Sequence, residues 1–344
     1  MKHSDFKEAA RRHQIDFKVN DPEINVLASR YPIRKITRND KTTVVHVESS
    51  LEWRDVRDEN GNYRIFFSGF REEITKEVDK PTTQLSNQMV TNLLRSEHIP
   101  YNLFFPMMKD PEGTATLFNR ILGEERIAKI EKILIEHNPG GLKDGTSFDT
   151  YVEYIPAGAK TGEKGAIGIE VKYTEKEYPI KKGTKEWNET HNEDGIHLAE
   201  NYRIPSFDSG WFVMDYIQDV PFSDSESAKE HVVADQYRQI WRNHILGAAM
   251  LLNGEVTEFT SLTVYPEKNG HFNDIWGNYE AKLTPEGKKT LKHITYEELF
   301  PMMRECFSDT AIPNRDEWID YTSKEDIWLN DNRRETYYCR DICA

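Results

Sequence analysis

The stretch from residue 147 to residue 175 restricts the fold of this chain more than any other, because it predicts a β-hairpin whose two faces differ. Side chains alternate along a strand, so one face of the second strand consists of Ile167, Ile169, Val171 and Tyr173. The opposite face carries Ala166, Gly168, Glu170 and Lys172. The wholly apolar face belongs in a core. A carboxylate and an ammonium group side by side on the other face indicate a functional site.

The first strand of this hairpin places Asp149 on the same face as Tyr151 and Glu153. If residues 156–164 form the connecting loop, a hairpin folded about Lys160 brings Asp149 within about one residue of Val171. The aspartate then lies beside Glu170 and Lys172. The loop length alone leaves the register open by one residue.

Two carboxylates at that separation are suited to a hard divalent cation, with Mg²⁺ as the expected ion and Mn²⁺ as the alternative. Water and a substrate phosphate would complete the coordination. A lysine two residues after the second carboxylate reaches the same space, where it can orient or deprotonate an attacking water and offset negative charge. The residues Asp149, Glu170 and Lys172 thus predict hydrolysis of a phosphodiester.

These three residues resemble the D…E-x-K core of the PD-(D/E)XK, or restriction-endonuclease-like, superfamily, with Phe148 where the motif name has proline. The strings F-D-x-x-x-x-Y and G-I-E-V-K-Y-T-E are similar to a group of largely uncharacterised bacterial members. The resemblance implies an α/β fold with a central mixed sheet flanked by helices and elaborated at both ends. It also implies a metal-dependent endonuclease that cleaves DNA.

The superfamily core runs helix, strand, hairpin, helix, strand, and the flanking sequence can be divided accordingly. A helix is predicted from Thr82 to Ser96, capped by Thr82 or Thr83 and with Leu85, Met89 and Leu93 on its apolar side. Residues 101–107 are expected to be a strand or an extended connection. A long helix from Ser227 to Leu252 and a strand from Val256 to Tyr265 follow the hairpin.

One stripe of the long helix starts with Gln239, Arg242 and Asn243, which the resemblance places next to the metal site. Gln239 is predicted to support catalysis. Arg242 and Asn243 are predicted to contact phosphate, with structural hydrogen bonding as the open alternative. Gln88 and Glu153 are predicted to support the metal ligands without binding the metal themselves. Superfamily members often have a glutamate in the first helix, and this chain has none there.

The remaining sequence suggests additions to one compact domain. We expect an N-terminal extension over residues 1–80, the nuclease-like core over 81–266 and a C-terminal extension over 267–344. Within them the patterns predict helices at 5–13, 114–136 and 296–306 and strands at 42–47 and 63–70. Cys306, Cys339 and Cys343 show no disulfide or zinc spacing and are expected to be thiols.

A formal net charge of -14 should repel a polyanion at long range, so binding of nucleic acid has to be local. The basic stretch with Lys176, Lys181 and Lys182 directly follows the catalytic strand and is the predicted phosphate contact; a solvated loop is the alternative. Nothing here spans a membrane or forms a signal peptide, so a cytoplasmic protein is expected.

Three alternatives remain open from the sequence. Asp149, Glu170 and Lys172 could form a cross-strand ion network on a solvated face. The chain could keep the nuclease scaffold and only bind nucleic acid or a protein partner. Two carboxylates could also serve a glycosidase, although the neighbouring lysine argues against it. Choice of DNA over RNA, sequence specificity and a homodimer are not fixed by these residues.

Overall fold

The computed structural model describes residues 3–20, 33–38, 41–46, 49–81, 83 and 86–323, and these form two compact units. The first unit comprises residues 1–113, 172–175 and 296–344. The second comprises residues 114–171 and 176–295. The short segment 172–175, which directly follows the predicted catalytic strand, therefore belongs to the first unit.

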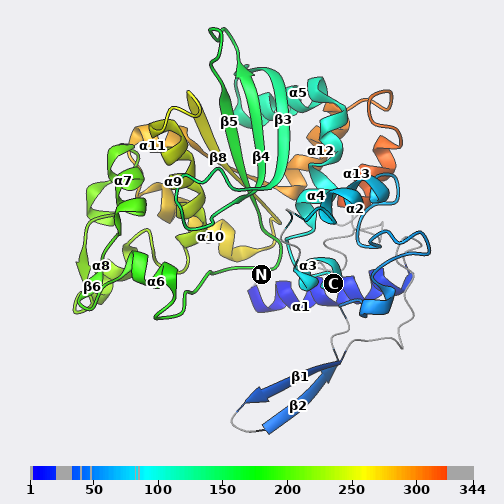
Figure 1. Cartoon of the computed structure of the whole chain (residues 1–344), viewed down its shortest axis with the longest axis horizontal. Helices are drawn as coiled ribbons and strands as arrows, with labels where there is room; N and C mark the ends of the chain where they lie inside the picture. Colours follow the sequence, from blue (N-terminus) through cyan, green and yellow to red (C-terminus); the bar gives the residue numbers. More distant parts are fainter. Residues whose placement is uncertain are drawn as a thin grey trace. The chain divides into compact units, whose positions relative to one another are not determined.

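The first unit is mainly helical (Figure 1). Its helices are α1 (His3–Asn20), α2 (Arg71–Val78), α3 (Asn87–Thr91), α4 (Ile99–Leu103), α12 (Tyr296–Cys306) and α13 (Arg315–Ser323), with 3₁₀ turns η1 (Trp53–Asp55) and η2 (Pro106–Lys109). Strands β1 (Ile33–Arg38) and β2 (Lys41–His46) pair as an antiparallel hairpin. Buried Asn102 joins segments distant in sequence, since it bonds to Ile65 and Phe67 through its side chain and to Trp318 through its carbonyl.

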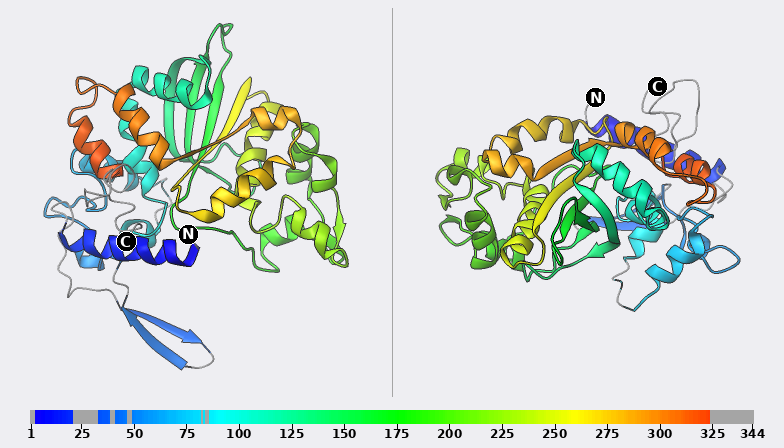
Figure 2. Two further views of the ribbon diagram at one scale, coloured as in Figure 1. Left: turned by 180° about the vertical axis from the view of Figure 1, so that it is seen from behind. Right: turned by 90° about the horizontal axis from the view of Figure 1, so that it is seen from above.

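The second unit is built on a five-stranded mixed sheet in the order β3-β4-β5-β8-β9. Its strands are β3 (Ile127–His137), β4 (Phe148–Pro156), β5 (Gly165–Val171), β8 (Glu258–Tyr265) and β9 (Leu291–Thr295). The first three are antiparallel neighbours, whereas β5, β8 and β9 run parallel. Figure 2 shows these strands side by side with the usual twist.

The other elements of the second unit surround this sheet. Its helices are α5 (Pro111–Leu122, which begins in the first unit), α6 (Lys185–Thr190), α7 (Glu200–Asp208), α8 (Ser225–Glu230), α9 (Arg238–Leu252), α10 (Gly270–Glu280) and α11 (Pro285–Lys289). A 3₁₀ turn η3 (Met214–Tyr216) and a small β6 (Gly195–Ile196)–β7 (Val220–Pro221) pair complete it.

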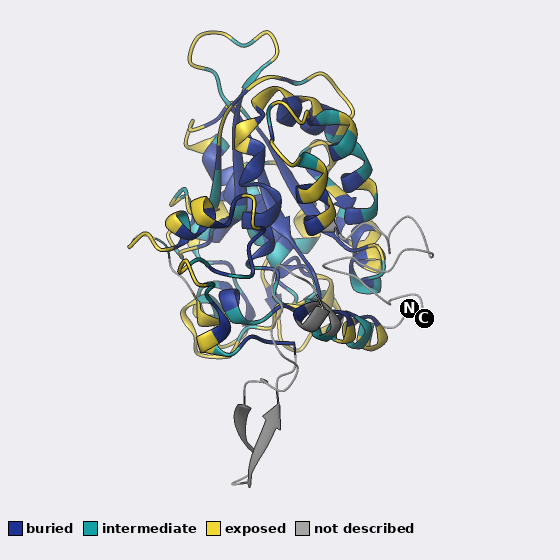
Figure 3. Cartoon of the chain, turned by 90° about the vertical axis from the view of Figure 1, so that its right-hand side faces the viewer, coloured by how far each residue is buried: buried dark blue, intermediate teal, exposed yellow. Residues whose placement is uncertain are grey.

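Helix α9 packs against β5 and β8, and its contact with the sheet is close. At Gly247 a Cβ atom would overlap the ring of Phe259 on β8, so only glycine allows this approach. The resulting core includes Ile240, Trp241 and Leu246 from α9, all of them buried. β5 is buried along its whole length and β8 at every residue but the first, and Figure 3 shows such buried strand segments in dark blue.

The predicted hairpin and the strand after the long helix are confirmed. Residues 148–156 and 165–171 form β4 and β5, and residues 258–265 form β8. The helix at 296–306 is confirmed as α12, and the one at 5–13 lies inside the longer α1. Residues 42–46 of the strand predicted at 42–47 lie in β2, and Val47 lies outside the described residues.

The helix predicted from Thr82 to Ser96 is wrong in length. The structure has a helix only from Asn87 to Thr91, and Ser86 caps it by accepting a hydrogen bond from the backbone of Met89. Thr82 and Leu85 lie outside the described residues. The strand or extended connection at 101–107 is also wrong, because α4 and η2 occupy that stretch.

Two other predicted elements are replaced by different structure. The predicted helix at 114–136 ends after Leu122, where Gly123 has a φ of 78°, and β3 follows. The side chain of Asn119 then bonds to both backbone groups of Ile127, which fixes the change from helix to strand. The strand predicted at 63–70 is a run of turns, since the Arg71 side chain binds the carbonyls of Arg64 and Phe66.

The long helix predicted from Ser227 to Leu252 is two helices. Asp224 caps α8, which ends at Glu230, and α9 begins at Arg238. Between them the ring of His231 accepts a hydrogen bond from the backbone of Val233 and so competes with helical bonding. None of the described helices is long and apolar enough to cross a membrane.

Candidate active site

The β4–β5 hairpin brings the two predicted carboxylates together. Thr150 pairs with Ile169 and Tyr151 with Gly168, so the next position of this antiparallel register sets Asp149 opposite Glu170. The backbone N–H of Val171 donates a 2.7 Å hydrogen bond to Asp149 Oδ2. The predicted register, with Asp149 within about one residue of Val171, is confirmed.

Glu170 is also held from outside the hairpin. The side-chain amide of Asn243, in the second turn of α9, donates a hydrogen bond to Glu170 Oε2. The two residues are only 5% and 3% exposed. This buried bond fixes one oxygen of the carboxylate, so α9 lies at the site as the resemblance implies. Contact between Asn243 and nucleic acid stays a prediction.

Lys172 lies one residue beyond the end of β5 and belongs to the first unit. The residue is 3% exposed, and its backbone carbonyl accepts a 3.1 Å hydrogen bond from the hydroxyl of Tyr296. The strand period directs Lys172 to the same face as Glu170. Its place beside the two carboxylates stays a prediction.

The donor set at the hairpin fits a hard divalent cation. Asp149 and Glu170 supply carboxylate oxygens from directly opposite strand positions. Mg²⁺ is commonly held by one or two carboxylates together with water and substrate phosphate, and does not require a complete cage of protein ligands. In the described part of the chain no three or more His, Cys, Asp or Glu residues gather as such a cage. A two-carboxylate site is therefore the arrangement that the residues support.

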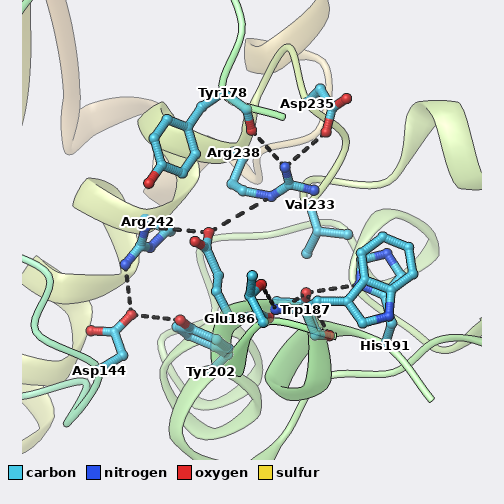
Figure 4. A network of polar contacts seen from close by, with 12 residues as sticks. Asp144, Tyr178, Glu186, Trp187, His191, Tyr202, Val233, Asp235, Arg238 and Arg242 are labelled. Atoms are coloured by element: carbon cyan, nitrogen blue, oxygen red, sulfur yellow. Dashed lines mark hydrogen bonds and ion pairs between the residues drawn. The ribbon is translucent and has the colours of Figure 1, made fainter. Parts of the chain in front are cut away.

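The remaining polar residues at the head of α9 differ in their surroundings. Gln239 is half-buried, and its side chain has no hydrogen-bond partner among the described residues. Arg242 is engaged: its guanidinium binds Asp144 at 2.8 Å, Glu186 at 3.2 Å and the hydroxyl of Thr146 (Figure 4). Arg242 thus lies in an ion-pair cluster, and its predicted phosphate contact is not tested by these bonds.

The two carboxyl groups that bind Arg242, those of Asp144 and Glu186, have pKa values shifted in opposite directions. Burial opposes ionisation of Asp144, but hydrogen bonds from Tyr202 and Thr146 lower the pKa of its carboxyl. Burial raises the pKa of Glu186, although the positive charge of Arg242 partly offsets this. This cluster was missed at the sequence level because Asp144 and Arg242 are 98 residues apart.

The predicted phosphate-binding lysines lie on the surface. Lys176, Lys181 and Lys182 are exposed, and Lys176 is 3.2 Å from a carboxylate oxygen of Glu177. Their exposure leaves them accessible to an approaching strand. Binding of nucleic acid there stays a prediction.

The two predicted outer residues lie in different places. Gln88 is exposed on α3 in the first unit. Glu153 shares the strand face of Asp149 but lies four residues further along β4, about 13 Å at the strand rise. Its carboxylate binds Lys132 at 3.1 Å and Lys164 at 2.9 Å, which lowers its pKa against the effect of burial. Glu153 is therefore occupied by ion pairs at the far end of the hairpin.

Comparison with known proteins identifies the family and gives no individual relative. No curated protein and no solved structure matches the chain. The model of the PD-(D/E)XK nuclease superfamily matches residues 2–321, which is most of the sequence. The chain therefore belongs to the PD-(D/E)XK nuclease superfamily.

Proposed function

We propose that the protein is a Mg²⁺-dependent endonuclease that hydrolyses phosphodiester bonds of DNA. The observation that carries the proposal is the pairing of Asp149 with Glu170 across β4 and β5, followed by Lys172 two residues later. Family membership supports a nuclease-like scaffold and a nucleic-acid substrate. The metal, the choice of DNA and retained catalysis are the proposed steps.

Each residue has a defined task in this proposal. Asp149 and Glu170 hold the cation, and Asn243 holds Glu170 in the orientation that binding requires. A bound divalent cation supplies Lewis acidity at the phosphate and lowers the pKa of a water molecule. Lys172 orients the attacking water or accepts its proton. The water oxygen bonds to phosphorus, the P–O bond to the leaving sugar oxygen breaks, and that oxygen takes up a proton to become a hydroxyl.

Gln239 and the basic segment act on the substrate side of the proposed mechanism. Gln239 has no competing partner among the residues described, so its amide is available to a water or a phosphate oxygen. Lys176, Lys181 and Lys182 provide positive charge close to the end of β5, which a chain with net charge -14 needs for local binding.

A substrate survey tests the proposal. Purified protein should nick or linearise supercoiled plasmid in Mg²⁺ or Mn²⁺, and EDTA should abolish cutting. Linear duplex, single-stranded DNA and RNA tested beside it distinguish endonuclease from exonuclease action and DNA from RNA. A folded protein that cuts none of these but retards DNA in EDTA would instead be a non-catalytic binder on the same scaffold.

A further inference from the structure

A pocket of about 370 Å³ opens in the second unit beside α6 and the first turns of α9. Its size is in the range of sites that hold a small organic ligand. The lining residues that matter for its chemistry are Asp144, Tyr178, Lys181, Lys185, Glu189 and Arg242. Of these residues the proposed mechanism uses Lys181 alone, as positive charge for local binding.

Two residues of the pocket lining lie close along the chain to residues of the two-carboxylate site. Arg242 lines the pocket, and the next residue, Asn243, donates to Glu170. Asp144 lines it too, and the chain enters β4 and reaches Asp149 five residues later. The pocket and the two-carboxylate site are therefore built from neighbouring stretches of the chain.

One acceptor in the pocket wall has no donor. Glu189 Oε2 is buried and has no hydrogen-bond partner among the described residues, while Lys185 lies 3.7 Å from its other oxygen. Leaving a buried carboxylate oxygen without a donor is unfavourable. This oxygen is closed off from the cavity, so a ligand that donates N–H groups reaches it only if the Glu189 side chain turns toward the pocket.

The rest of the pocket suits the other parts of a nucleotide. Lys181 and Lys185 are exposed cations at its edge, which favour a phosphate. Tyr178 is 40% exposed and offers an aromatic ring on which a base can stack. Carboxylates read bases by accepting from their N–H groups. Cation, aromatic ring and N–H acceptor are thus combined in one cavity.

We propose that this pocket binds one nucleotide of the substrate strand, with guanine preferred over the other bases. Guanine presents a ring N–H and an amino group side by side, and a carboxylate can accept from both. The base pairs with Glu189 and stacks on Tyr178, while Lys181 contacts its phosphate. This inference rests on the proposed function, because it names a group of the proposed DNA substrate.

Calorimetric titration of the full chain in EDTA with the four deoxynucleoside 5′-monophosphates and with inorganic phosphate tests this assignment. We expect dGMP to bind most tightly. Glu189→Gln should weaken dGMP at least about tenfold, because an amide offers one acceptor where the carboxylate offers two. The same variant should leave binding of inorganic phosphate unchanged. Lys288→Ala, which changes an exposed lysine of α11 outside the pocket lining, is the matched control and should bind dGMP like the wild type.

Equal binding of all four nucleotides and of phosphate, or no effect of Glu189→Gln, would overturn the assignment and leave only an anion site or none. The two proposals also fail separately. Plasmid cleavage without dGMP binding would remove the pocket assignment alone. Binding of dGMP by a protein that cuts no nucleic acid would remove the nuclease alone, since the titration needs neither metal nor turnover.

Discussion

Asn243 on α9 donates a hydrogen bond to the buried carboxylate of Glu170 on β5, across 73 residues of sequence. The hairpin alone places Glu170 opposite Asp149, and the helix then fixes which way that carboxylate points. The candidate metal site is therefore a product of the packing of α9 on the sheet as well as of the hairpin motif.

Replacing Asn243 with alanine should weaken divalent metal binding about 10- to 100-fold, the usual effect of removing a residue that orients a metal ligand. The measurement is titration with Mn²⁺ or Mg²⁺ followed by calorimetry, with the folded state checked by circular dichroism. Asn278→Ala, at an exposed position of α10, is the control and should bind metal normally. Unchanged affinity in Asn243→Ala would contradict the role assigned to this residue.

Glu153 and Glu170 lie on one face of the same hairpin, yet we expect their replacement to have unequal effects. Glu153→Gln should keep cleavage within about twofold of wild type, because its ion pairs with half-exposed Lys132 and Lys164 contribute at most about 1 kcal/mol to stability. Glu170→Gln should abolish cleavage. Rates measured side by side at saturating metal decide this, and a comparable loss in Glu153→Gln would restore the predicted supporting role of Glu153.

Gly168 on β5 is expected to tolerate no larger residue. A Cβ atom there would overlap the ring of Phe148 on the paired strand, and overpacking of this kind destabilises proteins by about 1–3 kcal/mol. Gly168→Ala should lower the urea midpoint accordingly. The control is Gly277→Ala, where α10 leaves open space, and it should be neutral or stabilising by up to about 1 kcal/mol. Equal midpoints for the two variants would be inconsistent with this packing.

His244 makes stability depend on pH in a defined direction. Its ring is buried between Tyr279, at 3.3 Å, and the hydroxyl of Thr290, at 2.7 Å, and burial lowers its pKa from 6.5 to about 3. The unfolded chain therefore binds a proton below pH 6.5 that the folded chain does not bind. The contribution of the neutral His244 ring to the free energy of unfolding is fully present above pH 6.5. It is lost progressively between pH 6.5 and about pH 3, by up to about 1.4 kcal/mol per pH unit.

Denaturant titrations at pH 7.5 and 5.5 measure this effect. His244→Gln removes the titrating group, so the loss of stability between these two values should shrink by about 1.4 kcal/mol relative to wild type. An unaltered slope in His244→Gln would show that this ring does not stay neutral in the folded protein.

The sequence predicted the hairpin well because its signals are local. Alternation of apolar and polar residues, a polar loop and the D…E-x-K spacing are all contained in 29 residues and need no distant contact. Asp149 and Glu170 were therefore placed correctly. The sequence did not predict why a small residue stands at position 168. A Cβ atom there would overlap the ring of Phe148, so the packing of that ring requires glycine.

The sequence could not predict elements whose ends are set by distant or side-chain contacts. Residues 63–70 have strand-like composition, but the Arg71 side chain donates hydrogen bonds to the carbonyls of Arg64 and Phe66, and the segment forms turns. The Arg242 cluster depends on Asp144 and Glu186, which lie 98 and 56 residues away along the chain. No local sequence pattern predicts contacts between residues so far apart. The hydrogen bond from Asn243 to Glu170 likewise became evident only from the packing of α9 on the sheet.

Single-turnover cleavage of end-labelled DNA by wild type, Asp149→Asn, Glu170→Gln and Glu153→Gln, each over a series of Mg²⁺ concentrations, tests the central claim most directly. We predict Mg²⁺-dependent cleavage by wild type and Glu153→Gln. Asp149→Asn and Glu170→Gln should be at least about 100-fold slower, since a direct ligand matters more than a residue that orients one. Undiminished cleavage by Asp149→Asn or Glu170→Gln, with the proteins folded, would contradict the assignment of the hairpin carboxylates as the catalytic metal site.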